Sequence, residues 1–286
     1  MRKLIGINRD ADAHWVGNGF PVRTIFSYQT LGQCISPFLL LDYAGPAEFP
    51  PSDQPRGVGE HPHRGFETVT IVYQGELEHR DSAGNRGTIG PGDVQWMTAA
   101  SGVVHEEWHE RAFTQRGGVL EMVQLWVNLP AKDKMSKPRY QEVLAKTIPV
   151  VTLDGAGTAR VIAGEFRGAK GPAKTFTPVT VVDLRLRAGG RTEVAFPDGH
   201  TALVFVLKGK AVMNGAETAG EADLAVFDRA GDRFVVEAGE DSTLLVLGGT
   251  PIEEPVVSYG PFVMNTEAEV RQAMQDYRSG RMGYLS

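Results

Sequence analysis

His61-Pro62-His63-Arg64-Gly65-Phe66-Glu67 and, further along, Ser101-Gly102-Val103-Val104-His105-Glu106-Glu107 carry the strongest pattern in this sequence. Side chains of an extended strand alternate between its two faces, so His61, His63 and Glu67 are expected to point the same way. His105 and Glu107 share a face for the same reason. Antiparallel strands joined by hairpins lie side by side, which would place both sets around one ion. The pattern therefore predicts a metal site built from a β-sheet.

Length and composition indicate two globular domains and argue against nucleic acid as a partner. The chain has 286 residues, of which 42% are hydrophobic, and domains mostly run to about 100 to 200 residues. The net charge is −6, from 29 basic and 35 acidic residues, and no run of Lys or Arg interrupts this balance. This charge argues against direct nucleic-acid binding. We expect small molecules or proteins as partners.

The single cysteine, Cys34, excludes an internal disulfide framework and a thiolate-rich metal site. Imidazole and carboxylate remain as the available ligands, and a lone thiol fits a reducing compartment. Residues 1–15 hold one apolar cluster, residues 4–7, which is shorter than the roughly 7 to 15 residues of a signal-peptide core. No run approaches the roughly 18 apolar residues of a membrane span. We expect a cytoplasmic protein without membrane contact.

Short β-prone runs dominate the sequence, and its 34 glycines and 17 prolines separate them. This composition predicts an all-β sandwich or barrel. The turn formers at residues 81–85 predict a hairpin. The predicted strands are residues 23–26, 37–41, 68–73, 77–80, 86–89, 94–97 and 119–128.

The polar, proline-bounded residues 130–138 suggest a domain boundary, giving domains 1–135 and 136–286. Beyond this boundary the pattern repeats, because residues 203–209 resemble 68–75 and residues 222–227 resemble 92–97. We interpret the repeat as an internal duplication. The second copy lacks the ligand types, since alignment of the repeats places Ala195, Pro197, Thr201, Val235 and Glu237 at the positions of His61, His63, Glu67, His105 and Glu107.

One helix is predicted near the end of the chain. Thr266 and Glu269 form a capping-box pattern, and an apolar stripe follows before Gly280. The stripe predicts packing against a sheet.

Four stretches together resemble the pirin family: HPHRGFETVT at 61–70, GPGDVQWMTA at 90–99, QLWVNLP at 124–130 and GPFVMNT at 260–266. Pirins belong to the cupin superfamily. The resemblance implies a bicupin, made of two stacked jelly-roll β-barrels, with a metal in the N-terminal barrel only. The lack of ligands in the second copy agrees with this expectation.

By this resemblance, the three-histidine, one-glutamate site of the family falls on His61, His63, His105 and Glu107. It implies one divalent metal per chain, and the usual metal in the family is iron, as Fe(II). The ligand types also suit Mn(II), Ni(II), Co(II) and Zn(II). Glu67 is not a usual pirin ligand, so we expect it to orient a histidine by accepting its free N–H.

The other histidines are expected to lie outside the site. A regular strand would place His109 roughly 13 Å from His105, too far to share an ion. His14, His79 and His200 are expected to be exposed polar residues. The sequence leaves open whether Phe66, Trp96 and Met97 line a pocket or belong to the core.

Bacterial pirin-like proteins resemble quercetin 2,3-dioxygenases, which open the central ring of a flavonol with O₂ and release carbon monoxide. The resemblance implies a flavonol-like substrate and a catalytic role for Glu107 in taking the proton of the flavonol hydroxyl. Eukaryotic pirins are described as iron-dependent transcription coregulators, which implies an alternative: a metal or redox sensor that binds a protein partner. A third alternative is isomerase or lyase chemistry with the metal as a Lewis acid. Consumption of O₂ with substrate distinguishes these alternatives.

Overall fold

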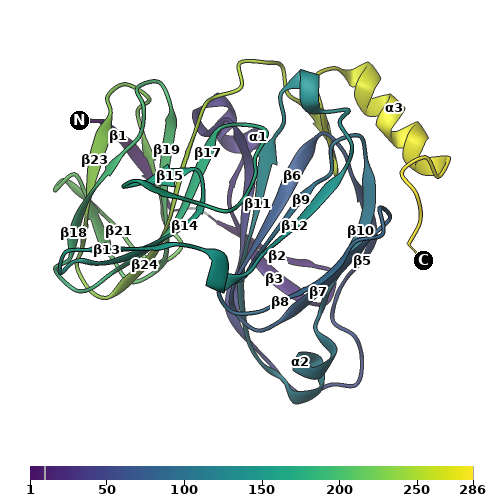
Figure 1. Cartoon of the computed structure of the whole chain (residues 1–286), viewed down its shortest axis with the longest axis horizontal. Coiled ribbons are helices and arrows are strands. Elements are labelled where there is room, and N and C mark those ends of the chain that lie inside the picture. Colours follow the sequence, from purple (N-terminus) through teal and green to yellow (C-terminus); the bar gives the residue numbers. More distant parts are fainter. Residues whose placement is uncertain (10, 286) are drawn as a thin grey trace. The chain divides into compact units, whose positions relative to one another are not determined.

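The computed structural model describes residues 1–9 and 11–285 of the chain. Strands dominate the fold (Figure 1), which confirms the all-β prediction. Two compact units make up the chain. The first unit comprises Asp12–Thr24, Leu40–Ala145 and Ile252–Ser286, and the second comprises Met1–Ala11, Ile25–Leu39 and Lys146–Pro251. Among the described residues, no helix is long and apolar enough to cross a membrane.

The first unit contains the motif histidines, and its described residues form a large sheet, a small sheet and a hairpin. The large sheet has the order β12 (Arg139–Val143), β9 (Val94–Thr98), β6 (Phe66–Gln74), β11 (Gly118–Asn128), β4 (Phe38–Phe49), β3 (Phe20–Ser27) and β2 (Asp12–Val16). The small sheet has the order β5 (Gly57–His63), β10 (Val103–His109), β7 (Leu77–Asp81) and β8 (Arg86–Ile89). The hairpin pairs β25 (Val257–Tyr259) with β26 (Phe262–Met264).

The second unit repeats this plan. Its large sheet has the order β1 (Leu4–Asn8), β22 (Leu224–Phe227), β19 (Thr201–Lys208), β24 (Ser242–Gly249), β17 (Val179–Leu186), β14 (Gly157–Ala163) and β13 (Val150–Leu153). Its small sheet has the order β18 (Arg191–Ala195), β23 (Arg233–Ala238), β20 (Ala211–Met213) and β21 (Glu217–Ala219). A short pair joins β15 (Glu165–Phe166) to β16 (Ala169–Lys170).

The strand orders confirm the internal duplication. The series β9-β6-β11-β4 corresponds to β22-β19-β24-β17, and β5-β10-β7-β8 corresponds to β18-β23-β20-β21. The motif similarity between 68–75 and 203–209 thus falls on corresponding strands, β6 and β19. In each unit, the large and the small sheet described above are open rather than closed into one barrel, which refines the expected barrel geometry.

The compact units are not two contiguous halves of the chain, because the two ends are exchanged. Residues 1–11 belong to the second unit, and residues 252–286 belong to the first. β1 pairs with β22 at one edge of the second unit's large sheet, whereas β12 pairs with β9 at the corresponding edge in the first unit. Edge pairing uses backbone groups, so either segment can complete a sheet. The division into domains 1–135 and 136–286 stays a prediction about the duplicated sequence.

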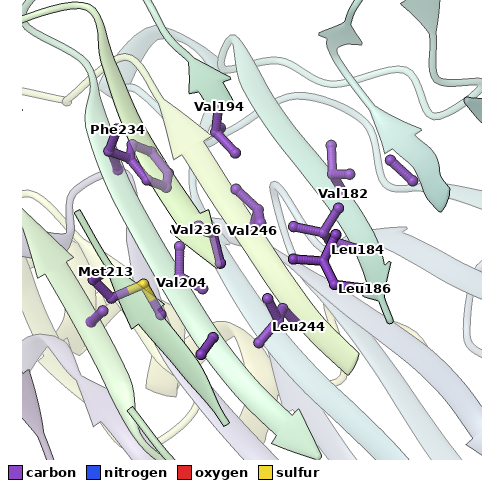
Figure 2. Packing of buried hydrophobic residues seen from close by; sticks show 14 of the residues in the cluster. Val182, Leu184, Leu186, Val194, Val204, Met213, Phe234, Val236, Leu244 and Val246 are labelled. Carbon is purple, nitrogen blue, oxygen red and sulfur yellow. The ribbon is translucent and has the colours of Figure 1, made fainter. Parts of the chain in front are cut away.

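Apolar side chains fill the second unit where the first carries histidines. Val194 of β18 and Phe234 and Val236 of β23 are buried in one cluster with Val204 and Val246 (Figure 2). These inward residues replace Ala195, Val235 and Glu237, which alignment of the repeats had placed at the ligand positions. The alignment was displaced at Ala195 because five residues join β18 to β19, whereas two join β5 to β6. It was displaced at Val235 and Glu237 because five residues join β22 to β23, whereas four join β9 to β10. The second unit thus offers an apolar interior at this place.

Helices are short in the described part of the chain. They are α1 (Tyr28–Leu31), α2 (Arg111–Arg116), α3 (Glu267–Arg278) and the 3₁₀ turns Gly32–Ile35, Ala131–Asp133 and Ala145–Thr147. α3 confirms the predicted C-terminal helix, including the capping box of Thr266 and Glu269. Its residues Val270 and Ala273 are buried, as expected for an apolar stripe packed against a sheet.

Candidate metal centre

The two motif strands lie side by side, as predicted. β10 pairs antiparallel with β5, and His105 lies opposite His61 while Val103 lies opposite His63. The pairing with β5 is irregular between His105 and Glu107, where the register shifts. On its other side β10 pairs with β7, and Glu107 lies opposite His79. The small sheet therefore brings side chains from three strands to one place.

Three of the predicted ligands form one cluster. His61, His63 and His105 each offer a nitrogen, and these atoms lie within 4.8 Å of one another. The ring centroids are 4.9 Å apart for His61 and His63, 4.3 Å for His61 and His105, and 4.8 Å for His63 and His105. His63 and His105 are buried, whereas His61 is partly exposed. A cluster of this size and chemistry is able to hold a divalent metal ion.

The ring nitrogens support this fit. His61 Nδ1 lies 2.8 Å from the carbonyl oxygen of Gly59. Because a carbonyl only accepts, Nδ1 carries the proton and Nε2 keeps its lone pair. His63 Nδ1 and His105 Nε2 are buried and have no hydrogen-bond partner among the described residues. Buried polar atoms are nearly always paired, so these nitrogens indicate that a further group belongs at the site.

Burial also favours the neutral imidazoles that a metal requires. It lowers the pKa of His63 well below the usual value, and the charge of neighbouring His61 lowers it further. Burial likewise lowers the pKa of His105, with added contributions from His61, His63 and His79. Neutral histidines keep a lone pair for a metal ion, so binding does not have to displace a proton.

Glu107 lies beside His105 and His79 rather than beside His61 and His63. Its Oε1 accepts hydrogen bonds from Gln95 Nε2 at 3.0 Å and Thr70 Oγ1 at 3.2 Å. With His79 and His105 it forms a second group whose ligand atoms lie within 4.8 Å of one another. The structure thus places the four predicted ligands in two groups that share His105.

His79 was expected to be exposed, and this expectation was wrong. It is buried at 4% exposure, and its ring lies 5.3 Å from that of His105. The glycine that ends β6, Gly75, does not lead to the surface, because β7 begins at Leu77 and pairs with β10. His79 therefore lies on the inner face of the small sheet, beside the predicted ligands.

Glu67 was expected on the same face as His61 and His63, and this was also wrong. The strand breaks at Arg64 and Gly65, where Gly65 has φ 90°, and β6 then enters the other sheet. Alternation does not carry across such a break, so Thr70 of β6 faces Glu107 while Glu67 faces away. Glu67 accepts a hydrogen bond from Thr98 Oγ1 at 2.6 Å rather than from a histidine.

The remaining histidines lie outside the cluster, in agreement with the sequence. His109 is buried against Phe49, with ring centroids 4.7 Å apart, and its Nε2 lies 2.8 Å from the carbonyl oxygen of Gly19. His14 is exposed. His200 is partly buried, which differs slightly from the expected surface position, and its Nε2 lies 3.3 Å from Thr250 Oγ1.

Aromatic rings border the cluster on two sides. Phe66 lies 5.1 Å from His63 and 4.3 Å from Trp126, measured between ring centroids. Tyr140 stacks on His79 at 5.0 Å with an interplanar angle of 16°. Trp96 and Met97, the other residues considered for a pocket, are both buried.

A cleft of about 990 Å³ lies on the other face of the small sheet. Its lining includes Glu78, Arg80 and Glu106, which alternate along the strands with His79, His105 and Glu107, and it also includes His79. Arg80 pairs with Glu106 there, so Glu106 points away from the histidines, as its position in the strand predicted.

The C-terminal segment of the first unit supports the turn after His63. Arg64 donates hydrogen bonds to the Ser101 carbonyl at 2.7 Å and to Asp276 Oδ2 at 2.8 Å. Lys134 Nζ donates to the carbonyls of Gly65 and Val263 at 2.7 and 3.0 Å. These contacts fix the chain that carries His63.

Comparison with known proteins agrees with this arrangement. The pirin family model matches residues 19–127, and the pirin C-terminal cupin domain model matches residues 181–283. A Pseudomonas aeruginosa protein is 58% identical over 282 residues, covering 98% of each chain. The chain belongs to the pirin family. The expected pirin resemblance and bicupin fold are both confirmed.

Several relatives and solved structures are similar to this chain in sequence or fold. The name of the Pseudomonas relative provisionally assigns it quercetin 2,3-dioxygenase, and a pirin-like protein of Solanum lycopersicum is 41% identical over 271 residues, covering 94% of this chain and 89% of its own. The crystal structure of quercetin 2,3-dioxygenase from Acinetobacter baumannii is 51% identical, covers 100% of both chains and has a TM-score of 0.97. The Escherichia coli pirin YhhW in complex with nickel(II) shares the fold at 20% identity, with a TM-score of 0.67 over 88% of this chain and 100% of its own.

Proposed function

We propose that this pirin is a metal-dependent dioxygenase that cleaves a flavonol such as quercetin with O₂. The observation that carries the proposal is the cluster of His61, His63 and His105, with buried, unpartnered nitrogens on two of them in the described structure. The close relation to proteins named as quercetin 2,3-dioxygenases supports the choice of reaction and substrate.

The three histidines would hold the metal through ring nitrogens, and Glu107, which the structure groups with His105 and His79 rather than with His61 and His63, is the proposed fourth ligand through its carboxylate. Iron(II) is our choice on family grounds, and the same donors suit Mn(II), Ni(II), Co(II) and Zn(II). When bound, a divalent ion in this set would supply open coordination positions for a flavonol oxygen and for O₂.

Glu107 has a second role in the proposal, as the base that takes the proton of the flavonol hydroxyl. Gln95 and Thr70 hold its Oε1 at 3.0 and 3.2 Å, and such fixed donors keep a carboxylate in one position. Oε2 has a weaker contact, with Gln124 Nε2 at 3.5 Å, and is the oxygen better placed to accept a proton. Phe66 and Trp126 provide an aromatic wall beside His63, suited to a planar aromatic substrate.

The test is O₂ uptake with quercetin, together with carbon monoxide release, by the parent and by Glu107→Gln at equal metal occupancy. Glutamine keeps the size of the side chain but accepts no proton near neutral pH. We expect turnover to fall by roughly 10² to 10⁴-fold, as is typical for loss of a general base. Equal rates would remove Glu107 from the chemistry. Uptake no greater than that of free metal in the parent would refute the dioxygenase.

A further inference from the structure

A buried Asp81–His79 pair lies directly behind His105 and is not part of the predicted ligand set. We infer that these two residues are positioning residues, which fix the tautomer of His105 so that it presents Nε2 to the metal. The inference rests on the metal site of the proposed function. It concerns which atom of His105 binds and how the chain holds it there.

Asp81 is held by the turn that follows it. Its Oδ1 accepts hydrogen bonds from the backbone N–H groups of Ala83 at 2.9 Å and Asn85 at 3.1 Å, and from Asn85 Nδ2 at 3.0 Å. Oδ2 also accepts from Asn85 Nδ2, at 2.9 Å. Asp81 is 6% exposed. The turn at 81–85, which the sequence predicts as a hairpin connection, thus fixes a buried carboxylate.

Asp81 in turn sets the proton position on His79. His79 Nε2 lies 3.2 Å from Asp81 Oδ2, and an ionised carboxylate only accepts, so Nε2 carries the proton. His79 Nδ1 is then left as an acceptor. The stacked ring of Tyr140 fixes the plane of the imidazole, so Nδ1 points in one direction.

Two donors face His79 Nδ1. Gln95 Nε2 lies 3.3 Å away, and its orientation follows from its other contacts, since Tyr140 donates to Gln95 Oε1 at 3.3 Å and Gln95 Nε2 donates to Glu107. His105 Nδ1 lies 3.4 Å from His79 Nδ1. His79 Nδ1 has no proton, so in a hydrogen bond between these two nitrogens His105 Nδ1 is the donor and shares the single lone pair of His79 Nδ1 with Gln95.

His105 Nε2 therefore keeps its lone pair. This is the nitrogen that is buried without a partner in the described part of the chain. A separation of 3.4 Å is long for an N–H···N hydrogen bond, so the contact selects the tautomer and orientation rather than adding much energy. Residues that orient a metal-binding histidine in this way typically contribute roughly 10- to 100-fold to metal affinity.

His79 is better placed to position His105 than to bind metal itself. Although His79, His105 and Glu107 lie within 4.8 Å of one another, Asp81 already engages His79 Nε2, and Gln95 and His105 face its Nδ1. Metal stoichiometry distinguishes the two roles, because a second site would add a second equivalent.

The test compares Asp81→Asn with Asp93→Asn as a matched control. Asp93 accepts backbone hydrogen bonds from Gly90 at 3.0 Å and Ala145 at 2.7 Å in the same unit, and it makes no hydrogen bond to a histidine among the described residues. In Asp81→Asn, the asparagine oxygen has to stay on the N–H groups of the turn, so the NH₂ group of the new side chain faces His79 Nε2. That arrangement moves the His79 proton to Nδ1, opposite the Nδ1 proton of His105.

Metal affinity is measured by titrating the metal-free proteins with Co(II), together with the visible absorption spectrum of the bound Co(II) and the thermal unfolding of each metal-free protein. We expect Asp81→Asn to bind Co(II) roughly 10- to 100-fold more weakly than Asp93→Asn and to change the spectrum, even where the two unfold at similar temperatures. Equal affinity and an unchanged spectrum would overturn the inference. The parent should bind one equivalent of Co(II), and His79→Phe should bind Co(II) as weakly as Asp81→Asn does. If the parent instead binds two equivalents and His79→Phe binds one, His79 is a ligand and the inference is overturned. A parent that binds no metal would overturn the proposed metal site and this inference together.

Discussion

Replacement of Glu67 by glutamine should make the stability of the first unit less sensitive to pH. Glu67 is fully buried, and burial raises its pKa from 4.5 to about 7, against smaller opposing contributions from Thr98, Trp96 and Arg139. The neutral carboxyl is thus favoured in the fold. Its contribution to stability is complete below about pH 4.5 and is lost as the pH rises through about 7.

The magnitude follows from this difference in pKa. The two pKa values differ by about 2.5, and each pKa unit corresponds to about 1.36 kcal/mol. The free energy of unfolding of the parent should therefore fall by about 3 kcal/mol between about pH 4.5 and pH 8. The glutamine side chain of the Glu67→Gln variant does not titrate and still accepts the hydrogen bond of Thr98. The free energy of unfolding of Glu67→Gln should therefore rise by about 3 kcal/mol relative to the parent over this range.

Tryptophan fluorescence is suited to the measurement, because Trp15, Trp96, Trp108 and Trp126 all lie in the first unit. Urea unfolding of the metal-free proteins would be followed at about pH 4.5 and pH 8, on either side of the raised pKa. Glu121→Gln, from β11 of the same sheet, corrects for the general loss of one carboxylate. If the difference in the free energy of unfolding between the parent and Glu67→Gln is the same at both pH values, the reasoning is refuted.

Three further changes test other parts of the molecule. Asp276→Ala leaves the buried Arg64 guanidinium without its carboxylate, so the first unit should lose about 3 kcal/mol of stability in urea unfolding followed by fluorescence. Metal analysis should find one metal per chain in the parent and none in a His61→Ala, His63→Ala double variant, and two tightly bound equivalents would contradict a single site. Arg2→Met removes a guanidinium that donates to the carbonyl oxygens of Phe196, Pro197, Asp228 and Arg229. The free energy of unfolding of the second unit should fall by about 3 kcal/mol, which would be measured as faster amide hydrogen exchange in its strands.

Sequence patterns were sufficient for the central strands of the first unit and for bringing three of the predicted ligands together. β6, β9 and β11 consist of β-prone residues between glycine or proline turns, and His61, His63 and His105 each lie within one unbroken strand, where alternation holds. The exchange of chain ends could not be predicted, because the pairing of β1 with β22 relies on backbone groups that leave no side-chain pattern.

The errors at the site have local causes. Alternation failed for Glu67 because Gly65 lies between two strands of different sheets. His79 was overlooked because its neighbour β10 is remote in sequence. The spacing of His79 and Asp81 by two residues was the available signal, since both then lie on the face of β7 that the predicted hairpin turns toward His105.

The exchanged ends also determine when the protein can fold during synthesis. β1 is synthesised well before its partner β22, so its edge stays unpaired until residues 224–227 have been made. Asp276, the partner of Arg64, belongs to α3 and lies 212 residues further along the chain. Contacts of such long sequence separation form slowly. The turn that carries His63 therefore gains the support of Arg64 by Asp276 only after α3 has been synthesised, so the predicted metal site is fully braced late in folding.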